Sequence, residues 1–117
     1  MASKILLTMD DLETAVRVNA ALEASGHATA MISSLDDARG AIRREAPELV
    51  ILTGAVHELP ARQLATYARD AEISTLALLE PTDQSRAEPE RRPDVTEVAV
   101  KPVNPAELVH LAERLVA

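Results

Sequence analysis

The chain is nearly devoid of aromatic residues and contains no cysteine. Its 117 residues include one Tyr and no Phe, Trp or Cys. The missing cysteine excludes disulfide bonds and thiol catalysis, and it is compatible with the reducing cytoplasm, where we expect the protein to act. A core without Phe or Trp must be built from Leu, Val, Ile and Ala. A hydrophobic content of 47% suffices for one domain spanning residues 1–117.

Residues typical of catalytic and metal sites are also scarce. The three glycines, at positions 26, 40 and 54, form no glycine-rich phosphate loop. The three histidines, His27, His57 and His110, lie far apart and lack the spacing of metal ligands. No Ser-His-Asp arrangement can be argued from the sequence. We therefore expect neither an enzyme nor a bound cofactor.

Long hydrophobic runs and an excess of positive charge are absent too. The residues after Met1 include no long apolar stretch, so neither a signal peptide nor a membrane-spanning helix is expected. The net charge of −7 repels a nucleic-acid backbone unless basic residues form a stripe. The doublets Arg43-Arg44 and Arg91-Arg92 are short and flanked by acidic residues. We expect no direct nucleic-acid binding and no membrane association by this chain.

What the sequence does contain is a regular alternation of strand and helix patterns. Short apolar segments predict strands, the second of them weaker and at an edge: residues 4–9, 27–32, 49–53, 75–79 and 97–100. Helices are predicted between them, at residues 12–25, from 34 onward, at 61–71 and from 104 to the end. Pro81, Pro89 and Pro93 interrupt residues 80–94, so a fourth helix there should be short or distorted. The alternation predicts an α/β fold with a parallel sheet and helices on both faces.

The helix patterns also predict where two helices begin and which side chains face the core. Ser34 with Asp37 has the form of a capping box, and Asn104 before Pro105 is a strong helix start. Apolar residues at helical spacing predict the buried faces: Ala15, Val18, Leu22, Leu35, Ala38, Ile42, Leu64, Ala68, Ala71, Leu108, Leu111 and Leu115.

Ligands of such a sheet bind where the parallel strands end. The residues at the predicted strand ends are Met9, Asp10, Asp11, Thr53, Leu79, Glu80, Lys101 and Pro102.

Four segments around these positions together resemble one protein family. Lys101-Pro102 stands before a helix start of the form Asn-Pro-x-Glu-Leu, and residues 4–11, 47–53 and 76–81 carry weaker similarity. The pattern resembles the receiver domain of bacterial response regulators over essentially the whole chain. The resemblance implies a flavodoxin-like (CheY-like) fold of strand order 2-1-3-4-5 and a role in two-component or phosphorelay signal transduction. Receivers often precede the effector of a transcription regulator, and whether this chain is the N-terminal part of a longer regulator stays open.

The chain departs from this family at the residues that carry receiver chemistry. The third strand of a receiver normally ends in the phospho-accepting Asp, and here it ends in Thr53. A hydroxyl cannot form the mixed acyl phosphate that a carboxylate forms when it attacks a phosphohistidine. By strand length, the family's acidic pair falls on Met9 and Asp10, and the hydroxyl residue of the fourth strand falls on Leu79 or Glu80.

Two further positions complete the comparison with the family. The aromatic switch position is Val98, and Lys101 alone keeps the family's residue. Mg²⁺ binding is not expected, because Asp10 and Asp11 are the only candidate ligands and the acid at position 53 is missing. We expect these two acids to cap the first helix instead. Lys101 is expected to form an ion pair with Asp10.

The resulting hypothesis is a pseudo-receiver that signals through phosphorylation-independent protein–protein contact. Receivers commonly use the fourth helix, fifth strand and fifth helix as their partner or dimer face, and the corresponding residues here are Val98, Ala106, Val109, His110 and Val116. Two alternatives stay open. One is a small flavodoxin-like ligand-binding or enzyme domain with a site at the strand ends, and the other is phosphate acceptance by Asp10 or Asp11.

Overall fold

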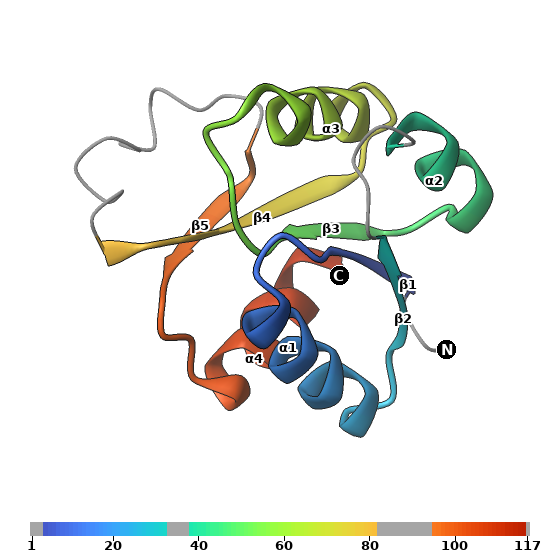
Figure 1. Ribbon diagram of the computed structural model, residues 1–117. Helices are drawn as coiled ribbons and strands as arrows, with labels where there is room; N and C mark the ends of the chain where they lie inside the picture. The colour runs from blue at the N-terminus through green and yellow to red at the C-terminus, as the bar shows by residue number, and fades with distance from the viewer. Residues whose placement is uncertain (1–3, 33–37, 82–94, 117) are drawn as a thin grey trace.

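The fold is built on a five-stranded sheet, seen in a computed structural model that describes residues 4–32, 38–81 and 95–116. The strands are β1 (Lys4–Thr8), β2 (Ala28–Ile32), β3 (Leu49–Leu52), β4 (Ser74–Leu79) and β5 (Glu97–Val100). They pair in the order β2-β1-β3-β4-β5, and every pairing is parallel. The predicted strand order and the predicted edge position of the second strand are confirmed (Figure 1).

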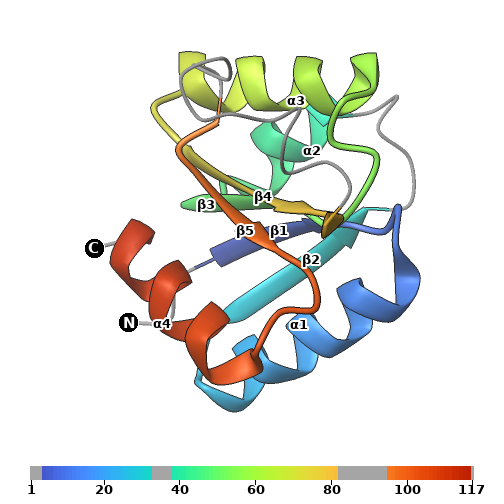
Figure 2. The same cartoon turned by 90° about the vertical axis from the view of Figure 1, so that its left-hand side faces the viewer.

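Helices cover both faces of this sheet, as predicted. They are α1 (Leu12–Ala24), α2 (Ala38–Glu45), α3 (Leu59–Asp70) and α4 (Pro105–Val116). Figures 1 and 2 show α1 and α4 together on one face and α2 and α3 together on the other. This is the arrangement of a flavodoxin-like (CheY-like) fold. No helix in the described part of the chain is long and apolar enough to cross a membrane.

Each face of the sheet has its own hydrophobic core. Along β1, Ile5 and Leu7 pack toward α1 and α4, whereas Leu6 packs toward α2 and α3. All residues of β3 are buried, because helices cover both sides of the central strands and leave no face for polar residues. This double burial explains the apolar runs that mark the central strands in the sequence.

Two predicted helix caps are present. Asp11 precedes α1 and accepts a hydrogen bond from the backbone N–H of Thr14 at 3.3 Å. The side chain of Asn104 accepts from the backbone N–H groups of Ala106 and Glu107 at 2.9 and 3.2 Å. Both caps satisfy N–H groups that have no partner within their helix.

Some helix boundaries and buried faces differ from the prediction. Helix α3 begins at Leu59 rather than at residue 61, because Pro60 fits the first turn, where no N–H is needed. Ala71 is exposed, since it caps α3 after its last turn. In α4 the fully buried residues are Leu108 and Ala112, while the predicted Leu111 and Leu115 are partly buried against the same core.

Two sets of predictions lie outside the described residues. One is the capping box of Ser34 and Asp37 with the buried position of Leu35. The other is the short or distorted fourth helix, which falls mainly on residues 82–94.

Candidate functional site at the strand ends

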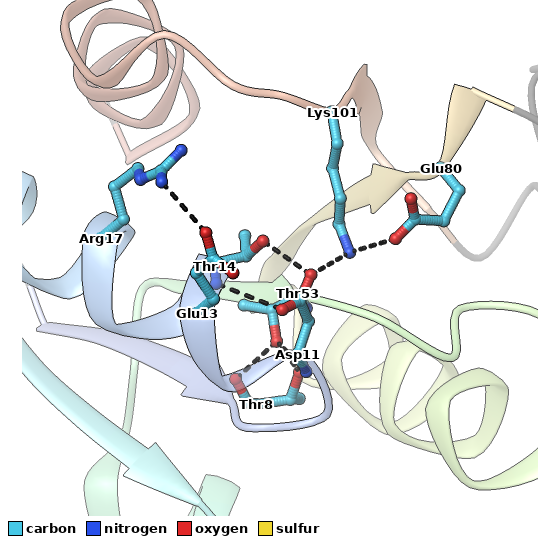
Figure 3. A network of polar contacts seen from close by, with 8 residues as sticks. All are labelled: Thr8, Asp11, Glu13, Thr14, Arg17, Thr53, Glu80 and Lys101. Carbon is cyan, nitrogen blue, oxygen red and sulfur yellow. Dashed lines mark hydrogen bonds and ion pairs between the residues drawn. The ribbon is translucent and has the colours of Figure 1, made fainter.

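The carboxyl ends of four strands meet at one edge of the sheet. The parallel register, which pairs Leu7 with Ile51 and Leu79 with Val100, brings the residues that follow β1, β3, β4 and β5 to this edge. Helix α1 begins there as well. Figure 3 shows the polar network that results, with side chains contributed by the first helix and by each of these strand ends.

Two buried threonines form the floor of this network. The backbone N–H of Thr53 donates to Oγ1 of Thr8 at 2.9 Å, and Oγ1 of Thr53 donates to the Thr8 carbonyl at 2.8 Å. The two hydroxyl oxygens lie 3.2 Å apart, and neither residue is exposed to solvent. The Thr53 hydroxyl is therefore already bonded and shielded (Figure 3). We call this pair the threonine clasp.

Lys101 lies above the clasp and connects three elements. Its Nζ donates to Oδ2 of Asp11 at 2.7 Å and to Oε1 of Glu80 at 2.9 Å. Its backbone N–H donates to the Leu79 carbonyl at 2.8 Å, and the peptide bond to Pro102 is cis. The ammonium thus ties the loop after β5 to the end of β4 and to the start of α1.

The predicted partner of Lys101 was wrong by one residue. The ion pair is made by Asp11, while Asp10 is exposed. Asp11 occupies the cap position of α1, which holds its carboxylate beside Thr14, whose Oγ1 donates to it at 2.7 Å. The capping geometry therefore decides which of the two adjacent acids meets the lysine.

The charges of this pair stabilise each other. Hydrogen bonds from Lys101 and then from Thr14 lower the pKa of Asp11 from 3.8 to about 2. Burial alone would lower the pKa of Lys101, but its hydrogen bonds to Asp11 and Glu80 outweigh that effect and raise the pKa above its ordinary value. Both groups are consequently charged across the neutral pH range.

Gly54 explains how closely the site packs. A Cβ added at this position would lie 3.3 Å from the Cβ of Asp11 and 3.4 Å from the Cβ of Asp10. These distances are tighter than most Cβ contacts, so a glycine lets the loop after β3 approach the acidic turn. The next residue, Ala55, has a φ of 52°, which is uncommon for a residue with a side chain.

The other predicted site residues do not join the network. Met9 continues the ladder to β2 through its N–H, which donates to the Ile32 carbonyl at 3.1 Å. Leu79 is buried in the core beneath α2 and α3. The site therefore brings together Asp11, Thr53, Glu80 and Lys101 of the predicted residues.

Sequence reasoning missed Thr8 and Thr14. Thr8 is a hydroxyl residue at the end of the apolar run of β1, and this strand is the neighbour of the one that leads to Thr53. That combination was the available signal. Thr14 stands three residues after the capping Asp11, which is the usual spacing of a cap partner.

The donor set does not suit a divalent cation. The Lys101 ammonium lies between the carboxylates of Asp11 and Glu80 and bonds one oxygen of each, so a cation there would be repelled by its positive charge. Among the described residues, no group of three or more His, Cys, Asp or Glu side chains could hold a metal ion. Beside Lys101 lies an open hollow of about 280 Å³, whose wall includes the ion pair of Glu13 and Arg17 at 3.3 Å.

The predicted interaction face is not one continuous patch. Val98 packs into the core beneath α2 and α3, whereas Val109 and Val116 are partly buried in the core on the opposite face of the sheet. Val109 and Val116 thus take flanking positions on α4, while Ala106 and His110 are exposed. The exposed large apolar residues of the described part are instead Leu12, Val16 and Leu59.

Comparison with known proteins gives a consistent result at the level of structure. No protein-family model and no curated protein matches the sequence. A putative response regulator from Chloroflexus aurantiacus superposes with a TM-score of 0.85 at 19% identity, covering 99% of this chain and 98% of that one. The receiver domain of NtrX from Brucella abortus superposes with a TM-score of 0.82 at 25% identity, covering 96% of this chain and 97% of that domain.

A longer NtrX chain from Brucella abortus matches as well, with a TM-score of 0.84 and 25% identity over 99% of this chain. This chain spans only 27% of that protein's length. These structural neighbours are receiver domains of response regulators or proteins that contain one. The fold and its neighbours therefore support a receiver domain with a role in response-regulator signalling.

Proposed function

We propose that this chain is a pseudo-receiver, a signalling module that acts by protein–protein contact without accepting a phosphoryl group. The observation that carries the proposal is the threonine clasp. Thr53 stands at the strand-end position where receivers place their acceptor, and its hydroxyl is buried and bonded to Thr8.

The chemistry around Thr53 supports this proposal. A hydroxyl becomes a nucleophile when a general base removes its proton. The polar atoms around Thr53 Oγ1 are the carbonyl and hydroxyl of Thr8 and, at 3.5 Å, the backbone N–H of Asp11. The Asp11 carboxylate is engaged by Lys101 and Thr14. Among the described residues, none of the hydrogen-bond partners of the Thr53 hydroxyl is a base that could activate it.

The state of Lys101 points in the same direction. A lysine that binds a transferred phosphoryl group must have donors to offer it. Here two carboxylates accept from its ammonium, and its side chain is only 9% exposed. An incoming phosphoryl group would compete with both carboxylates for the ammonium and would meet their negative charge. The site is thus suited to keeping Lys101 paired with Asp11 and Glu80 at all times.

On this account the signalling output is a constitutive protein contact in the cytoplasm. The module would belong to a two-component or phosphorelay pathway and could serve as the regulatory domain of a transcription regulator. It would have no catalytic activity of its own and would need no Mg²⁺.

The test is an NMR titration with beryllofluoride and Mg²⁺, which mimic a phosphorylated aspartate. We expect the amide resonances to stay in place, because residue 53 has no carboxylate to bind the reagent. A receiver domain that carries the acceptor Asp controls for the quality of the reagent. Large shifts around residues 9–11, 53 and 101 would contradict the proposal.

A further inference from the structure

A second hollow lies on the face of the sheet that α2 and α3 cover, opposite to the face covered by α1 and α4 (Figure 1). It occupies about 290 Å³ between α2 and the last turn of α3. The last turn of α3 leads into the start of β4, so this hollow is remote from the strand-end site. It is lined by Arg39, Ile42, Arg43, Tyr67, Asp70 and Ala71.

The single aromatic residue of the chain is part of this hollow. The guanidinium carbon of Arg39 lies 4.3 Å from the centroid of the Tyr67 ring. Tyr67 is partly buried against the core beneath α2 and α3, and the chain contains no second aromatic residue to stack on it. Stacking on the ring fixes the guanidinium plane and leaves its N–H donors at the edges free to meet a carboxylate.

A second guanidinium is presented beside the first. Arg43 follows Arg39 by four residues on α2, so the two side chains share one face of the helix. Both residues are exposed, and no carboxylate of the described residues forms an ion pair with either. Among the described residues, Asp70 is the one acid in the lining, which thus offers two arginines against one acid.

The shape of the hollow favours a polypeptide over an enclosed small molecule. Its volume lies just below the roughly 300–1,000 Å³ of small-molecule pockets, and it is open to solvent. Arg and Tyr are the residue types that most often dominate the free energy of protein–protein binding. The chain as a whole carries a charge of −7 and repels acidic molecules at long range. Attraction to an acidic segment must therefore be local to this hollow.

We propose that the hollow between α2 and α3 docks an acidic segment of a partner protein. Carboxylates of that segment would accept hydrogen bonds from Arg39 and Arg43, and an apolar side chain would contact Ile42 and Ala71. This inference specifies that the partner of the proposed signalling module presents acidic residues, and in that respect it rests on the proposed function. Its test uses no phosphoryl donor, so its failure would leave the conclusion about Thr53 unchanged.

The experiment is an NMR titration of the protein with a short capped peptide of alternating glutamate and leucine. We expect saturable shifts at Arg39, Arg43 and Tyr67, and weaker binding as salt is raised. Arg43→Glu should weaken binding at least tenfold, which corresponds to about 1.4 kcal/mol. Arg62→Glu makes the same charge change at an exposed residue of α3 outside the hollow and should leave affinity nearly unchanged. Asp70→Asn should strengthen binding.

Four outcomes would overturn this inference. The first is the absence of saturable shifts at these residues. The second is an equal loss of affinity in Arg62→Glu and Arg43→Glu, which would indicate unspecific charge attraction. The third is that inorganic phosphate, and not the peptide, causes the shifts, which would make the hollow a small-anion site. The fourth is that the same resonances shift with protein concentration alone, which would identify a second copy of this chain as the occupant.

Discussion

Oγ1 of Thr53 donates a hydrogen bond to the backbone carbonyl of Thr8 at 2.8 Å, while the N–H of Thr53 donates to the Thr8 hydroxyl. The two residues are far apart in the sequence, but Thr8 ends β1 and Thr53 follows β3, and these strands are neighbours in the sheet. In a receiver-like fold this position is the functional centre. Here it is closed by hydrogen bonds between two neutral side chains and their backbone.

The threonine clasp should contribute measurably to stability. Thr8→Val removes the acceptor of the buried Thr53 N–H, and an unsatisfied buried donor costs about 1–3 kcal/mol. We expect a loss of free energy of unfolding in that range by urea denaturation. The double variant Thr8→Val with Thr53→Val should lose less free energy of unfolding than the two single variants together, because the two residues share their hydrogen bonds. Strict additivity would show that the two hydroxyls act independently.

The ion pair of Lys101 and Asp11 predicts a dependence of stability on pH. The pKa of Asp11 is lowered in the folded state from 3.8 to about 2. A lowered carboxyl pKa stabilises the fold above the unfolded pKa, and this contribution disappears as pH falls through the folded pKa. The native protein should therefore lose up to about 2 kcal/mol between about pH 4 and pH 2.

Lys101→Met is the matched variant for that experiment. It removes the first cause of the lowered pKa, so the Asp11 carboxyl should titrate closer to its ordinary value by NMR. The unfolding free energy of the variant should also change less over the same acidic range. An unchanged Asp11 titration in Lys101→Met would mean that Thr14 alone holds the carboxylate in its charged form.

Glu72 offers a test of backbone strain at the end of α3. Its φ of 62° is in the left-handed region, and its N–H donates to the Arg69 carbonyl at 2.9 Å. Glycine adopts this conformation without steric cost, so Glu72→Gly should raise the free energy of unfolding by about 0.5–1 kcal/mol. Ala71, with a φ of −91°, is the control. Ala71→Gly should lower stability instead.

The apolar residues of α1 and α4 should respond differently to glutamate. Val109 and Val116 are packed against the core, so Val109→Glu with Val116→Glu should cost about 1–3 kcal/mol or more. Leu12 and Val16 are 56% and 55% exposed, and the same change there should alter stability by about 0.5 kcal/mol or less. Chemical denaturation of both double variants checks this. Equal losses would show that the outer face of α1 is covered in solution.

Much of the fold could be predicted because apolar runs and helical spacing report burial directly. The strands β1 and β3 are apolar on both sides since helices cover both faces, and the cap at Asn104 satisfies N–H groups next to it in sequence. A helix cap involves residues that are neighbours in the sequence, and burial on both faces of a strand leaves an apolar run, so both features can be recognised in the sequence.

The details of the site depend on geometry that spacing does not contain. Asp10 and Asp11 are equivalent in a sequence, and only the start of α1 decides which one turns toward Lys101. Thr8 looks like an ordinary strand residue until β3 is placed beside it. The partial burial of Val109 also depends on how far the core extends around α4, which helical spacing does not show.

The most direct measurement of the central claim is the intact mass of the protein after incubation with acetyl phosphate and Mg²⁺. The account predicts no added phosphoryl group, because Thr53 is buried in the clasp and Asp11 is held by Lys101. A receiver domain with the acceptor Asp, treated in parallel, should gain the phosphoryl mass. Stoichiometric phosphorylation of this chain, whether at Thr53, Asp10 or Asp11, would contradict the claim that it signals without phosphoryl transfer.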